Sequence, residues 1–439
     1  MFKHIVSCLG ALLLWQAGAA ASGDSALPDS LAAGRVLHLA AVPAHEGEAV
    51  PDTLKVSWQD ILRLADRHPR LAAGRLGVAA ARGAARAAGA LPNPTLDATL
   101  GRARALEGSE SRREWELALT LPLGWIAERG PRVEAAMAQV DASLEEARAV
   151  RRDVLLELRI LFWNLAHDQA RVAALEALQS QTAELARLVS RRVEKGEARP
   201  SEATRVEIEL EKVANQLESG WVSRRARQGQ LGLWVHGGPG SELVVDADLA
   251  SVPDAGGLDQ ALAASRSGHP LLEAARARLR ALSSEAGAEK RAWLRGAGVR
   301  GFVASELDAR SSGGGIALDL PLWNWNSGPI AQARAQREAA RRELEWETRK
   351  LESAVIEAHA ACEAASRAAA RYRDRIIPRS ESAASIMEKT YRLGEASLLE
   401  LIDARRVLVE TRLEYLAALA QAQLDYSRLR ALVSQEDAP

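Results

Sequence analysis

Two long apolar-periodic runs without glycine dominate the pattern of hydrophobic and polar positions along the chain. The first extends from Pro131 to Gly196, and the second from Pro329 to Gly394. Each run predicts one helix that ends just before its glycine and is about 100 Å long at 1.5 Å per residue. The interval from Pro131 to Pro329 equals the interval from Gly196 to Gly394, 198 residues in both cases. This equality predicts that the chain is a tandem duplication.

Shorter helical patterns accompany each long run. Return helices are predicted after the glycines, over residues 200–235 and 397–433, and further helices are predicted over residues 69–91 and 270–294. In this arrangement two shorter helices lie end to end beside each long one. Pro378 predicts a kink in the second long helix. Apolar residues at seven-residue intervals in the first long run, interrupted only at Arg151 and Asp168, are typical of a coiled-coil seam. They are Met137, Leu144, Leu158, Leu165 and Val172, with Val140, Ala147, Val154, Leu161 and Leu175.

A pair of short alternating segments precedes each long helix and predicts a β-hairpin. In the first half the strands are predicted over Thr95–Ala103 and Glu114–Leu121. In the second half they are predicted over Val299–Glu306 and Ile316–Leu320, on either side of a loop, residues 307–315, that ends in three glycines. The two predicted hairpins therefore span residues 95–121 and 299–320.

The second strand of the first hairpin has one apolar and one polar face. Trp115, Leu117 and Leu119 alternate with polar and small residues. This pattern fits a hairpin that is wet on one side. It equally fits a membrane barrel strand whose apolar face contacts lipid and whose polar face lines a lumen.

Composition and charge exclude some classes of function. Lysine and arginine number 57 against 58 aspartates and glutamates, so the whole chain offers no electrostatic basis for nucleic-acid binding. Only 4% of residues are aromatic, but 11 of these are tryptophan, and several lie beside the predicted strands. No Cys/His metal spacing, nucleophile elbow or phosphate loop is present, so no enzyme is predicted. No cofactor or bound metal is expected.

The N-terminal region predicts secretion. Lys3, an apolar run and Ala19-Ala20-Ala21 are typical of a secretory signal peptide, assigned to residues 1–21. Lipidation at Cys8 is set aside, because seven residues are too few for the charged and apolar parts of a signal. Removal of the predicted signal peptide would leave Cys362 as the only cysteine. We therefore expect Cys362 to be a small buried residue that forms no intrachain disulfide. No apolar run is long enough for a transmembrane helix.

The remaining segments complete the predicted organisation. Residues 22–56 are Ala/Pro/Gly-rich and predict a flexible leader, and Ser57 with Asp60 predicts a helix N-cap. His68-Pro69 and His269-Pro270 start helices, which favours capping over ligand roles for these histidines. The predicted boundaries are residues 57–235 for the first repeat, 236–257 for a linker with a strand candidate at Leu243–Val245, 258–433 for the second repeat, and 434–439 for a tail.

Four strands per chain cannot form a closed membrane barrel. An open sheet has two edges, and unpaired backbone groups are not tolerated in lipid. Small membrane barrels need at least eight strands. Strands must therefore be pooled between subunits, and three chains would supply twelve. The predicted fold class is mainly α with a small β part: a helical tube below a transmembrane β-barrel shared by a homotrimer.

Two motifs in the second half carry a family resemblance. They are Leu320–Gly328, LPLWNWNSG, and Tyr391–Arg405, YRLGEASLLELIDAR. With the duplicated strand–helix plan, they resemble the TolC-like outer membrane efflux proteins over about residues 57–433. In the first half, Leu91–Leu96 and Glu128–Val133 look most like the CzcC branch, which serves heavy-metal efflux pumps.

The resemblance implies roles for individual residues. Gly394, and Gly196 as its counterpart, match the tips of helical hairpins where a periplasmic membrane-fusion adaptor docks. Glu400 and Asp403 match acidic positions at a narrowed pore mouth, where rings of carboxylates would attract cations; a solvated helix face is the alternative. The counterparts in the first half are Glu202 and Arg205, and the arginine puts simple cation selectivity in doubt.

The tryptophans at the strand–helix junctions suggest a further surface. Trp125, Trp323 and Trp325 occupy positions expected of an aromatic belt at a membrane interface, although a core role for one of them fits as well. Trp115, Leu117 and Leu119 would then face lipid.

The sequence thus predicts a trimeric channel in the outer membrane of a Gram-negative bacterium, extending into the periplasm. By the resemblance, it would be the passive exit duct of a tripartite system with an adaptor and an inner-membrane RND pump, and its cargo would be heavy-metal cations. Drug efflux and type I secretion are alternatives with the same fold. A secreted coiled-coil scaffold without a pore is the alternative of another class.

Overall fold

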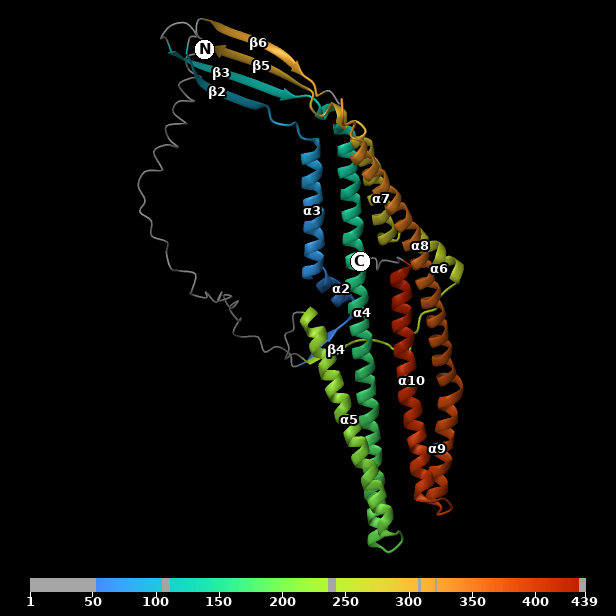
Figure 1. Ribbon diagram of the computed structural model, residues 1–439. Coiled ribbons are helices and arrows are strands. Elements are labelled where there is room, and N and C mark those ends of the chain that lie inside the picture. The colour runs from blue at the N-terminus through green and yellow to red at the C-terminus, as the bar shows by residue number, and fades with distance from the viewer. Residues whose placement is uncertain (1–52, 105–110, 236–241, 307–308, 320–321, 434–439) are drawn as a thin grey trace, which may run out of the picture. The chain divides into compact units, whose positions relative to one another are not determined.

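The computed structural model describes residues 53–104, 111–235, 242–306, 309–319 and 322–433 (Figure 1). The predicted signal peptide, Cys8, the predicted tail and most of the predicted leader lie outside the described residues. Most of the described chain is helical, with a small β part.

The elements follow one order in both halves. The first half contains strand β1 (Thr53–Val56), helices α2 (Trp58–Ala65) and α3 (Pro69–Gly89), strands β2 (Thr95–Arg104) and β3 (Ser111–Pro122), and helices α4 (Trp125–Glu194) and α5 (Pro200–Val235). The second half contains strand β4 (Glu242–Val245), helices α6 (Leu258–Arg266) and α7 (Pro270–Glu289), a 3-10 turn η1 (Ala292–Leu294), strands β5 (Gly298–Ser305) and β6 (Arg310–Ala317), and helices α8 (Ser327–Arg371), η2 (Tyr372–Ile376), α9 (Ile377–Arg392) and α10 (Leu398–Leu432).

The first long helix, α4, begins at Trp125, six residues before the predicted start. Pro131 therefore lies inside the helix and cannot donate to the carbonyl of Ala127. The guanidinium of Arg291 donates to that carbonyl instead, at 3.5 Å. This contact satisfies the acceptor and lets the helix continue through the proline.

Helices α3 and α5 pack beside different stretches of α4 (Figure 1). This arrangement agrees with the prediction that two shorter helices lie end to end beside each long one. In the second half, α7 packs against α8, and α10 packs against α8 and α9. Helix α4 also contacts α7 and α10, so the two halves share a core. Most residues of the predicted seam are buried, including Val154, Leu158 and Leu165. Met137 was also predicted to belong to the seam, but its side chain is 53% exposed.

The second long helix is interrupted where the proline predicts a disturbance. A π-helical turn, η2, separates α8 from α9 and ends two residues before Pro378. The missing N–H of Pro378 would leave the carbonyl of Asp374 without its normal partner, and a wider turn is a known way to accommodate such a break.

A two-stranded sheet corrects the predicted leader. β1 pairs in parallel with β4, with Val56 opposite Val245. Residues 53–56 are therefore part of the fold and do not belong to a flexible leader. The strand candidate at Leu243–Val245 is present as part of β4, and Leu243 is fully buried.

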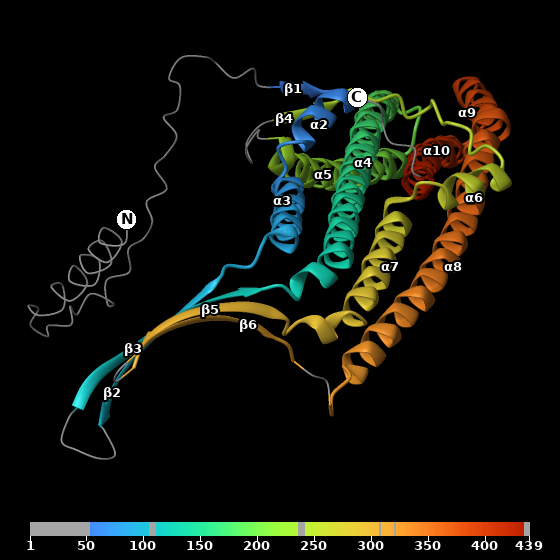
Figure 2. The same cartoon turned by 90° about the horizontal axis from the view of Figure 1, so that it is seen from above.

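The four remaining strands form one antiparallel sheet in the order β2-β3-β5-β6, so the two hairpins are joined by pairing between β3 and β5 (Figure 2). The predicted second hairpin is wrong in its last part: the three glycines belong to strand β6, not to a loop. Gly313 lies opposite Phe302, and a Cβ on Gly313 would lie 2.7 Å from that ring. Glycine here makes room for an aromatic side chain on the neighbouring strand.

The helix starts agree with the predicted caps. Ser57 and Asp60 form a capping box at α2. His68 caps α3, where its Nδ1 accepts from the backbone N–H of Arg70 at 3.1 Å, and its ring stacks on Trp234. His269 occupies the same position before α7 but is fully buried.

Candidate functional site

One face of the four-stranded sheet is apolar and exposed. The pairing register places Leu96, Leu119 and Gly301 in one row and Leu100 and Trp115 in another. Large apolar side chains on this face remain between 39% and 85% exposed; they are Leu96, Leu100, Trp115, Leu117, Leu119, Leu121, Val299, Val303 and Ile316. The predicted lipid-facing residues therefore belong to a larger surface that all four strands build.

The opposite face of the sheet carries polar and small residues, together with the ring of Phe302. Glu116 accepts from the guanidinium of Arg300 at 2.6 Å across the β3–β5 pair. Thr120 lies on the same face of β3 as Glu116, and Asp97 and Thr99 lie on this face of β2. One apolar and one polar face on four adjacent strands is the arrangement of a barrel wall between lipid and water.

The outer edges of this sheet have no partner strand within the described residues. β2 pairs only with β3, and β6 pairs only with β5. Each edge leaves a row of backbone N–H and C=O groups without a ladder, which makes it a template for a further strand.

The other end of the helices carries two tight turns with matching geometry. Gly196 follows α4 with φ of 75°, and Gly394 follows α9 with φ of 77°. The Glu197 N–H donates to the carbonyl of Arg192 at 2.8 Å, and the Glu395 N–H donates to that of Thr390 at 3.0 Å. These bonds define a Schellman motif at each tip, which requires a residue tolerant of positive φ.

Ser397 is the N-cap of α10, and Glu400 completes a capping box with it. Its carboxylate accepts from the backbone N–H of Ser397 at 2.8 Å and from the Ser397 hydroxyl at 2.9 Å. These bonds lower the pKa of Glu400, so it stays charged at a lower pH than an ordinary glutamate. The capping function was not identified in the sequence, although Ser397-x-x-Glu400 carries the same signature as Ser57 and Asp60.

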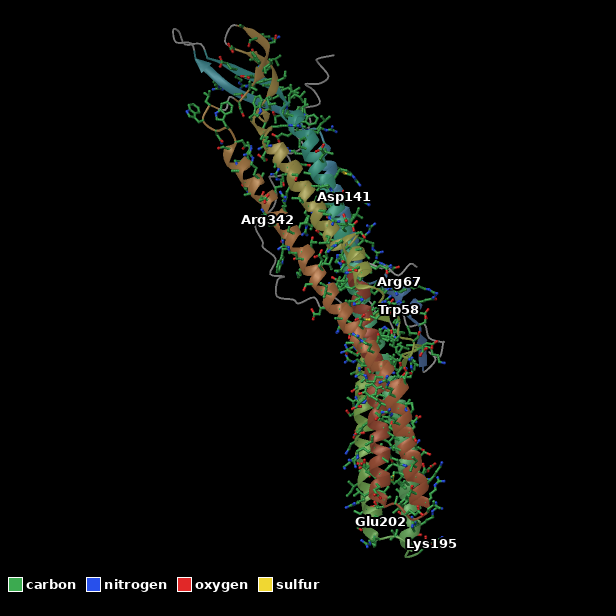
Figure 3. All side chains as sticks on the ribbon, turned by 90° about the vertical axis from the view of Figure 1, so that its right-hand side faces the viewer. Trp58, Arg67, Asp141, Lys195, Glu202 and Arg342 are labelled. Atoms are coloured by element: carbon green, nitrogen blue, oxygen red, sulfur yellow. The ribbon has the colours of Figure 1, made fainter. Side chains whose placement is uncertain are left out.

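The other predicted carboxylates near the tips are less engaged. The side chain of Asp403 is 65% exposed and lies 4.0 Å from Arg406 on its own helix. Glu202 lies in the first turn of α5, close to Lys195 at the first tip (Figure 3). Arg205 is exposed on the same helix. The structure thus places Glu202, Glu400 and Asp403 at the ends of the return helices next to the glycine turns.

Side-chain contacts join the two tips into one body. Tyr391, Leu398 and Leu401 pack with Val189 and Val206 in one apolar cluster. The guanidinium of Arg192 lies over the ring of Tyr391, 5.3 Å from its centroid. Arg406 of α10 approaches Glu209 of α5 at 3.9 Å. These contacts were not predicted, because they join residues that are distant in sequence.

The predicted interfacial tryptophans lie where strands give way to helices. Trp125 is the first residue of α4 and is partly buried. Trp323 is 92% exposed and Trp325 is 66% exposed, just before the N-cap Asn326. Neither of the last two has a core role within the described chain.

Two kinds of feature are absent from the described residues. No helix among them is long and apolar enough to cross a membrane. No group of three or more His, Cys, Asp or Glu side chains there is arranged to hold a metal ion.

Comparison with known proteins decides the family. A family model described as outer membrane efflux protein matches residues 61–228 and 261–435, one stretch in each half of the chain. The chain belongs to the outer membrane efflux protein family. The family consists of channel proteins, so the chain is a transport protein and not an enzyme.

Individual relatives agree with this assignment. The cobalt-zinc-cadmium resistance protein CzcC of Cupriavidus metallidurans is 23% identical over 334 residues, 75% of this chain and 78% of CzcC. A membrane protein from Pseudomonas aeruginosa has a TM-score of 0.72 at 21% identity, covering 85% of this chain and 92% of the other. CusC has a TM-score of 0.70 at 17% identity, covering 86% and 91%. The predicted TolC-like fold is confirmed by these likenesses.

Proposed function

We propose that three copies of this chain form an exit duct through the outer membrane of a Gram-negative bacterium. The duct works with a periplasmic membrane-fusion adaptor and an inner-membrane RND pump, and its cargo is heavy-metal cations. The observation that carries the proposal is the four-stranded sheet, which combines one exposed apolar face with two edges that have no partner strand among the described residues.

The sheet supports both the proposed insertion into the membrane and the proposed trimer. Its exposed apolar face would be covered by hydrocarbon, and its face with Glu116 and Arg300 would line water. In hydrocarbon each unpaired backbone group costs several kcal/mol, so the edges at β2 and β6 need partners. Pairing β6 of one copy with β2 of the next closes twelve strands from three chains and leaves no edge.

The helix tips support adaptor docking. Gly196 and Gly394 each form a Schellman turn, and no neighbouring group lies within 4 Å of where a Cβ would be on either glycine. Leu393 beside the second turn is 74% exposed. An accessible turn with an exposed apolar side chain suits a protein partner.

The carboxylates support a cation-selective mouth. In a trimer, Glu202, Glu400 and Asp403 would each repeat three times around the axis. Glu400 keeps its negative charge because its pKa is lowered, and the exposed side chain of Asp403 is accessible to ions. Rings of this kind raise the local concentration of cations.

The proposed cargo rests on a relative. CzcC is named for resistance to cobalt, zinc and cadmium. No chelating cluster is needed for such a cargo, because a passive duct is filled by its pump and selects by field and diameter.

A deletion strain tests the proposal. We expect sensitivity to salts of zinc, cobalt, cadmium, copper or nickel, with unchanged growth on dyes and antibiotics, and restoration by the wild-type gene. Sensitivity confined to dyes and antibiotics would contradict the cargo but keep the duct. Protein that is absent from the outer-membrane fraction, or that forms no heat-modifiable trimer there, would contradict the duct itself and favour a scaffold.

A further inference from the structure

A compact junction connects the apolar sheet to the helices. We call it the collar and define it as residues 125–132, 289–295 and 322–326. Arg295 donates to both carboxylate oxygens of Glu128, at 3.0 and 3.2 Å. Asn326 donates from Nδ2 to the carboxylate of Glu289 at 2.9 Å. The three segments are therefore tied together by side chains and form one surface.

The collar has an excess of positive charge. Residues 125–132 and 289–295 contain five cationic side chains and two carboxylates. Both carboxylates are engaged: Glu128 is fully buried between Arg132 and Arg295, and Glu289 accepts from Arg295 and Asn326. The internal ion pairs use up all the negative charge of these segments.

Three cations remain without a carboxylate partner. Arg129, Lys290 and Arg291 are exposed, and in the described part of the chain none of them forms an ion pair within 4.0 Å. Arg129 donates to the backbone carbonyl of Gly89 at 3.2 Å and lies 5.8 Å from the ring centre of Trp125. The backbone contacts of Arg129 and Arg291 hold these two charges in place, and no carboxylate among the described residues lies within 4.0 Å of either guanidinium.

Large apolar side chains are exposed around these cations. Ile126 is 59% exposed, Trp293 48% and Leu322 65%, in addition to Trp323 and Trp325. Tryptophan and arginine together are typical of the level of lipid headgroups, where an apolar ring meets a charged and hydrated layer.

The position of the collar agrees with that level. β3 ends at Pro122 and β5 begins at Gly298, and both Leu123 and Gly124 donate their backbone N–H to the carbonyl of Ala297. The collar thus begins where the exposed apolar face, with Leu121 and Val299, ends. A membrane that covers this face would place its phosphates beside Arg129 and Arg291.

We propose that the collar binds the headgroups of anionic phospholipids in the periplasmic leaflet of the outer membrane. The inference rests on the proposed function, because that function places the sheet in the membrane. Charge complementarity selects the occupant: a zwitterionic lipid would leave the three cations uncompensated, whereas a phosphodiester without an amine neutralises them. Anionic lipid would then anchor the duct at a fixed depth and orientation.

Lipid association in vesicles tests this proposal. The purified full-length protein is reconstituted into phosphatidylcholine vesicles that contain a trace of spin-labelled phosphatidylglycerol or spin-labelled phosphatidylcholine. The fraction of motionally restricted label gives the relative association of the two lipids with the protein. We expect about a two- to fivefold preference for phosphatidylglycerol, which weakens in high salt.

Variants separate the collar from other cations. The triple substitution Arg129→Gln, Lys290→Gln and Arg291→Gln should reduce the preference to about one, while Arg129→Lys with Arg291→Lys should retain it. The matched control is Arg225→Gln, Arg349→Gln and Arg379→Gln, which removes three exposed arginines without a described ion pair from α5, α8 and α9. This control should keep the preference.

The outcomes distinguish the two proposals. A restricted lipid population without headgroup preference in the wild type, or an equal loss of preference in the collar variant and in the control, overturns the collar proposal and leaves the duct intact. This is also the result expected if a neighbouring copy covers the collar. The absence of any restricted lipid would show that the protein does not enter the membrane, and it would overturn the proposed function as well.

Discussion

The two halves of the chain follow the same backbone plan but differ in their side-chain chemistry. Each half has a hairpin, a long helix, a glycine turn and a return helix. The first long helix is one α-helix of 70 residues, whereas the second is divided by the π-helical turn of η2. Spacing and turn geometry are therefore shared, while interior irregularities and charged contacts are specific to one half.

The tips illustrate this division. Gly196 and Gly394 have nearly the same positive φ and the same Schellman hydrogen bonds. The acids beyond them differ: Glu400 is fixed by a capping box, whereas no side-chain hydrogen bond of Glu202 is found among the described contacts. The shared glycine therefore serves the turn, whereas the acids beyond it differ in their hydrogen bonding between the two halves.

The histidine caps differ just as clearly. His68 is partly exposed, bonded to a backbone N–H and stacked on Trp234. His269 is fully buried, and Arg152 donates to its Nε2 at 2.5 Å. Because a guanidinium only donates, the ring hydrogen must lie on Nδ1, which has no partner. The same cap position is thus partly exposed to solvent in the first half, whereas in the second half it is buried and holds a histidine whose Nδ1 has no partner.

The largest expected effect concerns the tips. Gly394→Val should abolish export, because a β-branched residue disfavours positive φ by about 1–2 kcal/mol or more and would rebuild the turn. Gly394→Asn should retain most export, since asparagine tolerates this conformation. Gly196→Val would show whether the first tip is equally needed. Export is measured as metal resistance of the complemented deletion strain.

Trimer content is the companion readout for the tip variants. The four-stranded sheet lies at the opposite end of the helices from Gly394 (Figure 1), so Gly394→Val should leave heat-modifiable trimers intact. Gly83→Val is the control, because Gly83 is in the interior of α3, has no positive φ, and has no neighbouring group within 4 Å of where its Cβ would be. Normal export by Gly394→Val, or loss of its trimer, would contradict the docking function.

The next effect is on stability at acidic pH. Burial and the charge of Arg152 lower the pKa of His269 to about 4, from 6.5 in an unfolded chain. Between these values His269 is protonated in the unfolded chain but neutral in the folded chain. The free energy of unfolding therefore falls as the pH drops from 6.5 to 4. The loss approaches about 3 kcal/mol at 1.36 kcal/mol for each pKa unit.

Substitution of each histidine separates the two halves. His269→Asn keeps an N-cap side chain and should remove most of the difference in unfolding midpoint between pH 7 and pH 4.5, measured in detergent by denaturant titration. His68→Asn should remove much less, because its ring is more exposed. Equal effects of the two substitutions would show that burial of His269 does not govern the acid response.

The smallest effect is expected at the acidic residues beyond the second tip, at the proposed pore mouth. Replacing Glu400 and Asp403 together by alanine should reduce the preference for cations over anions about twofold in planar bilayers, because Glu202 remains. The control is the double substitution Glu395→Ala with Glu410→Ala. It also removes two acids, one before Glu400 and one after Asp403 in the sequence. Unchanged selectivity would assign Glu400 to capping alone and Asp403 to a solvated helix face.

Much of the helical framework could be predicted from the positions of glycine and proline in the sequence. Glycine and proline mark where helices reverse, and the predicted return helix over residues 200–235 has the same bounds as α5. The second hairpin was mispredicted because Gly313 and its neighbours read as a loop, whereas their place in β6 depends on the ring of Phe302 on another strand. Local pattern carries no information about such a partner.

The sites show the same limit. β1 was missed because four residues form a strand only through pairing with β4, far along the chain. The buried Glu128 and its partner Arg295 are 167 residues apart, so the collar becomes visible only in the folded chain. Glycine turns and capping signatures are local and could be recognised, but long-range ion pairs could not.

The proposed duct depends most directly on pooling of strands between copies. Its test is disulfide formation between a cysteine on β2, at Leu96, Ala98 or Leu100, and one on β6, at Ser312, Gly314 or Ile316, in a Cys362→Ser background. Oxidised outer-membrane fractions should contain covalent dimers and trimers and no larger species, for at least one pairing. Monomers in every pairing, or ladders that extend beyond the trimer, would contradict a closed barrel of three chains.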